Sequence, residues 1–120
     1  MTNLDIFTNS YIECALWASI DDDGEPLEND HTYESLAPEA LDAMQEDCRK
    51  FVEENFESIE EDPDNDFEQA GHDFFLTRNG HGAGFFDGDW SEPYAIILDK
   101  ASKAFGEIYL YSEGEIVYIM

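Results

Sequence analysis

The densest group of polar side chains able to do chemistry lies between residues 72 and 89. It contains two histidines, one arginine and three aspartates: His72, Asp73, Arg78, His81, Asp87 and Asp89. Imidazole and carboxylate groups together can bind a transition metal. The residues between the histidines predict a strand, however, and at about 3.3 Å per residue the two rings would lie at its opposite ends. We therefore expect no shared metal site, and we favour a structural role for this segment.

A calcium loop is the other metal site to consider. Asp62, Asp64 and Asp66 match the opening D-x-D-x-D of an EF-hand loop. Phe67 stands where that loop requires glycine, and Asp73 stands where it requires glutamate. We therefore predict no dedicated metal and no cofactor, only loose binding of divalent cations by an acidic surface.

The sequence carries none of the common catalytic motifs, such as GxSxG, the P-loop, HExxH or GxGxxG. Its many carboxylates allow any acid–base pair to be proposed, so they favour none. Cys14 and Cys48 lie far apart in the sequence, and we expect both to be reduced and buried. A nucleophilic cysteine needs an electropositive setting, which this chain does not offer. We predict that the protein is not an enzyme.

Charge is the strongest feature of the composition. Thirty acidic residues against five basic ones give a net charge of −25, while 42% apolar and 14% aromatic residues suffice for a core. Direct nucleic-acid binding is disfavoured, because it depends on lysine and arginine. An anionic membrane surface would repel the chain, and no segment is typical of a signal peptide or a membrane span. We expect a cytoplasmic protein that presents its charge to a basic partner.

Apolar spacing and turn residues predict an α+β fold, in which about three helices pack on a small antiparallel sheet of two hairpins. We expect one domain, with a helical acidic half (1–62) and a hairpin–helix–hairpin half (67–120). The predicted helices span 3–19, from Pro38 to about 62, and 94–105, with a short turn at 64–70 that Gly71 closes. The predicted strands are 73–77 and 84–87 around an Asn-Gly turn, then 108–111 and 116–119.

Charge density suggests what the acidic surface resembles. Duplex DNA carries one charge per about 1.7 Å of axis, so 25 charges correspond to about 42 Å of duplex. A chain of this length has a radius of gyration of about 13–14 Å and a long dimension approaching that value. Carboxylates three or four residues apart on a helix have Cβ atoms about 5–6 Å apart, the scale of successive phosphates. We predict a surface that mimics DNA.

The candidate partner-binding residues are the carboxylates of the predicted second helix and its two acidic flanks. They are Asp21, Asp22, Asp23, Glu25, Glu28, Glu39, Asp42, Glu46, Glu53, Glu57, Glu60, Glu61, Asp62, Asp64 and Asp66. The expected partner is a basic protein that normally grips nucleic acid, and a homodimer would double the charged length.

One stretch resembles a known signature. Residues 69–87, QAGHDFFLTRNGHGAGFFD, are similar to the pattern AGHDFWLTRNGHGAGFWDR of small tailed-phage proteins, mostly of unknown function. The likeness covers about residues 67–118 and includes Ala104-Phe105-Gly106-Glu107. Phe75 and Phe86 stand where tryptophan is common, and Gly88 replaces a basic residue. The resemblance implies a phage protein expressed in the host cytoplasm. By analogy with acidic phage inhibitors of restriction, CRISPR and repair enzymes, it favours a counter-defence role.

Other interpretations stay open at this point. Arg78, Asn79, His81, Asp87 and Trp90 could line a binding site at the end of the predicted hairpin, or form a fold signature of turn glycines and core aromatics. The protein could also be an acidic assembly module whose basic partner does not compete with nucleic acid. Adaptation to a salty solvent fits the acidic excess, but less well the nine acids among the sixteen residues 53–68.

Overall fold

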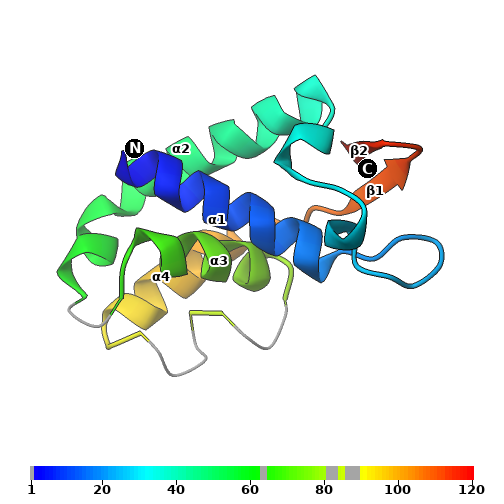
Figure 1. Cartoon of the computed structure of the whole chain (residues 1–120). Helices are drawn as coiled ribbons and strands as arrows, with labels where there is room; N and C mark the ends of the chain where they lie inside the picture. Colours follow the sequence, from blue (N-terminus) through cyan, green and yellow to red (C-terminus); the bar gives the residue numbers. More distant parts are fainter. Residues whose placement is uncertain (1, 63–64, 81–83, 86–89) are drawn as a thin grey trace.

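Helices dominate the computed structural model, which describes residues 2–62, 65–80, 84–85 and 90–120 (Figure 1). The described chain contains four α-helices, two short 3-10 helices and one two-stranded antiparallel sheet. In chain order these are α1 (Asn3–Ala18), η1 (Leu27–Asn29), η2 (Tyr33–Ser35), α2 (Pro38–Glu61), α3 (Phe67–Arg78), α4 (Tyr94–Lys103), β1 (Leu110–Glu113) and β2 (Ile116–Ile119). The result is a mostly helical α+β fold, with one sheet hairpin where two were predicted.

Helix α1 begins at a capping box. The Asp5 backbone N–H donates to Thr2 Oγ1 at 3.0 Å, and the Thr2 backbone N–H donates to Asp5 Oδ2 at 3.1 Å. The helix then runs beside α3 in the same direction, in front of α2 and α4 in the view of Figure 1. Gly71 allows this close approach, because a Cβ atom there would lie 2.1 Å from the Phe7 carbonyl oxygen.

An aromatic cluster fills the space between the helices. Phe51 of α2 stacks on Phe74 of α3 with ring centroids 4.2 Å apart, and Phe7 of α1 lies 5.6 Å from Phe51. Tyr11 and Phe105 close the cluster against Phe74, at 5.2 and 5.1 Å. Each helix therefore contributes apolar surface to one continuous core, which can stabilise the fold despite the repulsion among its carboxylates.

The segment 73–77 is helical, so the predicted strand there is wrong, as is the hairpin built on it. Asp66 caps α3 by accepting the Gln69 backbone N–H at 2.9 Å. The helix is buried almost all round, and a short run of buried residues does not reveal by its periodicity whether it is helix or strand. Gly71 lies inside this helix rather than at a cap. Gly80, with φ +72°, follows the C-cap Asn79, so Asn-Gly ends a helix here rather than turning a hairpin.

The other predicted elements are confirmed, with small shifts at their ends. Helix α2 starts with Pro38 in its first turn, and Gly106, with φ +76°, follows the end of α4. The C-terminal hairpin pairs Leu110 with Ile119 and Tyr111 with Tyr118. It docks beside the start of α2, where the Ala37 backbone N–H donates to the Val117 carbonyl at 2.8 Å (Figure 1).

The molecule measures 42 × 28 × 22 Å along its principal axes, with a radius of gyration of 13.9 Å. Helix α2 runs along the long axis from the hairpin end to the opposite end, where it bends (Figure 1). The bend lies at Asn55, whose φ of −127° is not helical and whose side chain donates to the Phe51 carbonyl. None of the helices in the described ranges is long and apolar enough to cross a bilayer.

Candidate protein-binding surface

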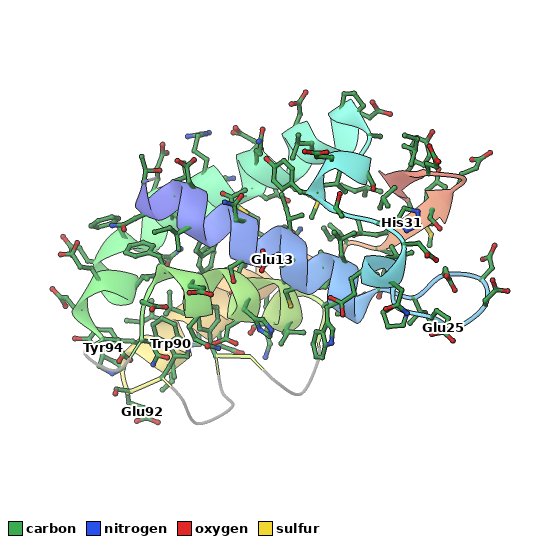
Figure 2. The ribbon with its side chains drawn as sticks, in the orientation of Figure 1. Glu13, Glu25, His31, Trp90, Glu92 and Tyr94 are labelled. Atoms are coloured by element: carbon green, nitrogen blue, oxygen red, sulfur yellow. The ribbon has the colours of Figure 1, made fainter. Side chains whose placement is uncertain are left out.

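Nearly all the carboxylates that the structure describes point into solvent. Among them Asp62, Asp73 and Asp99 are buried and Asp21 and Asp47 are half-buried, while the rest are exposed. Side chains with carboxylate tips project from both ends of the molecule, with Glu25 at one end and Glu92 near the other (Figure 2). The negative charge is therefore a property of the exterior rather than of one patch.

The few basic residues do little to offset this negative charge. Arg78 is buried and ion-pairs with Asp47 at 2.8 Å, and Lys103 pairs with Asp99 at 3.0 Å. Arg49 contacts Glu46 and, at 2.8 Å, Glu53. Three of the five cations are thus already matched by carboxylates of the same chain.

The solvent face of α2 carries the longest row of charges. Its predicted members are all exposed: Glu39, Asp42, Glu46, Glu53, Glu57 and Glu60. At about 1.5 Å per residue, the row from Glu39 to Glu60 spans about 31 Å of helix, with the bend at Asn55 inside it. Arg49 fills the gap in the row by bridging Glu46 and Glu53. The Lys50 Nζ lies 5.9 Å from the centre of the Phe105 ring.

The acidic loop after α1 is a turn that one of its own carboxylates stabilises. Asp21 Oδ1 accepts the backbone N–H groups of Asp23 and Glu25, at 2.9 and 3.0 Å, so this carboxylate shapes the loop. Asp22, Asp23, Glu25 and Glu28 are exposed, as predicted for binding residues.

His31 joins this loop to the hairpin (Figure 2). Its ring nitrogens lie 3.1 Å from the Leu27 carbonyl and 3.2 Å from the Gly114 carbonyl. Both carbonyls are acceptors, so both contacts are hydrogen bonds only when the ring carries two protons. Sequence spacing does not predict this link, because the Gly114 carbonyl lies 83 residues from His31.

The second acidic flank differs from the prediction. Asp62 is buried and accepts the Ser91 backbone N–H at 2.8 Å, so it is a structural residue and not part of an exposed surface. Asp66 is exposed, but its carboxylate caps α3. Glu61 is exposed, and Asp64 lies outside the described residues.

Arg78 is a structural centre of the fold, which corrects its assignment to a possible binding site. It is 4% exposed and donates to four oxygens: Tyr11 Oη at 3.0 Å, Asp47 Oδ2 at 2.8 Å, and the carbonyls of Phe105 at 3.2 Å and Gly106 at 2.8 Å. Its guanidinium also lies over the rings of Phe74 and Phe105. Arg78 thereby ties α1, α2 and α3 to the end of α4.

Two other motif residues also serve the fold. The Trp90 indole N–H donates to the buried Asp73 carboxylate at 2.7 Å, and its ring meets Phe85 edge to face at 5.2 Å. Asn79 Oδ1 accepts the Ile108 backbone N–H at 2.8 Å. His81 and Asp87 lie outside the described residues. The described part of the motif therefore supports its interpretation as a fold signature.

Buried thiols complete the chemistry of the interior. Burial, with the charge of Asp73, raises the pKa of Cys14 to about 12, and burial also raises the pKa of Cys48. A thiolate nucleophile requires the opposite shift. Within the described ranges, no three His, Cys, Asp or Glu side chains are grouped so that they could hold a metal ion.

No protein-family model, no curated protein and no solved structure matches this chain.

Proposed function

We propose that the protein is an acidic inhibitor that mimics DNA and occupies the nucleic-acid-binding groove of a basic protein. One observation carries this proposal: a net charge of −25 is spread along a long axis of 42 Å. That is one charge per about 1.7 Å, the axial charge spacing of duplex DNA. A groove that attracts a duplex by its charge density would attract this molecule by the same means.

The arrangement of the charges supports the proposal. Helix α2 holds its carboxylates on a rigid backbone along the long axis, so a partner need not order a flexible chain to meet them. A strongly anionic molecule is also steered towards a basic groove, which raises the association rate at low salt.

The resemblance of residues 67–118 to small tailed-phage proteins indicates which partners to test. We propose that the protein acts in the cytoplasm of a bacterial host, on a restriction, CRISPR or DNA-repair enzyme. These enzymes bind DNA through basic grooves, and the inhibitor would exclude the substrate without any chemistry of its own.

Competition against DNA tests this function. Purified enzymes of the three classes are incubated with a fluorescent duplex, and the protein is titrated at several salt concentrations. Displacement of the duplex that weakens steeply with salt is the expected result. If no enzyme binds, or if an enzyme binds the protein and its duplex together, the proposal is wrong.

A matched pair of variants shows whether the α2 row is the contact. The triple variant E53Q/E57Q/E60Q removes three charges from α2, and E92Q/E107Q/E113Q removes three exposed charges elsewhere. Both have the same net charge. The α2 variant should displace DNA at least tenfold more weakly than the control, whereas equal weakening would mean that only total charge matters.

An assembly module is the second candidate, and the outward face of the hairpin favours it. Tyr111 and Ile116 are more than a third exposed, and the Tyr111 and Tyr118 rings stack at 5.3 Å. This small apolar surface does not resemble DNA. A complex that persists in the presence of excess duplex would support this function over the first.

A further inference from the structure

A groove of about 590 Å³ lies beside the contact of α1 and α3 and holds a half-exposed tryptophan. Trp17, near the end of α1, is 52% exposed. The lining of the groove includes Glu13, Trp17, Glu28, Asp66, Glu68 and His72. Glu13 marks the middle of α1, where this helix passes α3 (Figure 2).

The indole of Trp17 packs against a histidine of α3. Its ring lies 5.9 Å from the His72 ring, at an interplanar angle of 36°. His72 Nδ1 is buried and lies 3.8 Å from Asp73 Oδ1, which is beyond hydrogen-bond distance. The Asp73 carboxylate accepts hydrogen bonds from Gln69 and Trp90 instead. A large aromatic side chain thus packs beside His72 while about half of it faces solvent.

Four carboxylates surround this indole, and the part of the groove that the structure describes is lined by no lysine or arginine. Glu13, Glu28, Asp66 and Glu68 come from α1, η1, the α3 cap and α3. The ion pairs of Arg49, Arg78 and Lys103 among the described residues involve other carboxylates. The groove therefore combines an exposed aromatic face with unneutralised negative charge.

We propose that this groove receives an arginine side chain of the basic partner. A guanidinium is planar, stacks on an indole face, and forms paired hydrogen bonds with carboxylates. The ammonium group of a lysine would be attracted by the carboxylates but could not stack flat on the indole. Tryptophan and arginine are also the residues that most often dominate the energy of an interface. The inference rests on the proposed function for its basic partner, but the groove contains no residue of α2, so it would be a second contact.

The test uses the full-length protein and a defined probe, acetyl-Gly-Arg-Gly-amide. The control peptide carries citrulline, which keeps the shape of arginine without its charge, and a lysine peptide tests the planar group. Binding is followed by NMR through the indole N–H of Trp17 and the ring of His72. The buried Trp90 indole serves as an internal reference.

We expect the arginine peptide to shift the Trp17 and His72 signals saturably, the lysine peptide to bind more weakly, and the citrulline peptide not to saturate. Trp17→Leu should weaken binding of the arginine peptide, read at His72, about fivefold. Equal binding of the arginine and citrulline peptides would overturn the proposal. So would shifts spread over the acidic surface without saturation at Trp17.

The two proposals can fail separately. If the protein displaces DNA from an enzyme but the arginine peptide does not bind at Trp17, the groove inference is wrong and the inhibitor function stands. If the peptide saturates at Trp17 while no enzyme is inhibited, the proposed function is wrong. The variant E53Q/E57Q/E60Q should keep the peptide site, because its substitutions lie on α2.

Discussion

Replacing Arg78 tests the claim that this residue holds the fold together rather than binding a ligand. In Arg78→Met the apolar part of the side chain is largely kept, but four hydrogen-bond acceptors lose their donor. Removing one partner of a buried ion pair costs about 3–5 kcal/mol. Because the Asp47 side chain is 34% exposed and can regain water, we expect the lower part of this range, about 3 kcal/mol.

Urea and thermal unfolding followed by circular dichroism measure this loss. A loss of about 3 kcal/mol corresponds to a melting temperature lower by about 10–20 °C in a domain of this size. Arg49→Met is the matched control, since Arg49 pairs with exposed glutamates and its loss should change the stability far less than the loss of Arg78. If Arg78→Met is as stable as Arg49→Met but loses partner binding, Arg78 belongs to a binding site and the structural assignment is wrong.

Three further predictions concern packing, thiols and the acidic loop. Gly71→Ala places a methyl group 2.1 Å from the Phe7 carbonyl oxygen, so urea unfolding should show a loss of about 1–3 kcal/mol in the free energy of unfolding. The control Gly24→Ala meets no atom within 4 Å and should act only through the positive φ of that position. The pKa of Cys14 is raised from 9.0 to about 12, so this thiol should resist thiol reagents at pH 8 until urea unfolds the chain. For the same reason, the free energy of unfolding should fall as pH rises from about 9 towards 12. Rapid labelling of the native protein would contradict this. His31→Phe should separate the acidic loop after α1 from the C-terminal hairpin. Amide hydrogen exchange should then rise at Gly24 and Leu27 while the aromatic core stays protected. Unchanged exchange at both amides would show that the His31 ring does not connect the loop to the hairpin.

The helices with clear local signals were predictable. Thr2 and Asp5 form the capping box of α1, Pro38 opens α2, and Gly106 follows α4, and each acts through its immediate neighbours. Local backbone chemistry of this kind is encoded within a few residues, which is why the sequence suffices to find it.

The segment around α3 was not predictable for a physical reason. Asp73, Phe74, Phe75 and Leu76 are all buried, so no polar face reveals a period of two or of 3.6 residues. As a helix, this segment packs closely against α1, because Gly71 has no side chain to clash with the α1 backbone. Asn79-Gly80 supplied a positive φ, which suits both a hairpin turn and a helix end, so the same signal had two meanings.

For the candidate site too, the sequence determined some features and only the tertiary structure decided the others. Composition alone established the charge of −25 and thereby a basic partner as the leading expectation. Tertiary structure decided which charges are available, because burial and pairing depend on residues far apart in the chain. Asp62 is buried against Ser91, and Arg78 reaches Tyr11, 67 residues away. The Trp17 groove likewise exists only where α1, η1 and α3 meet, so no spacing along the sequence could show it.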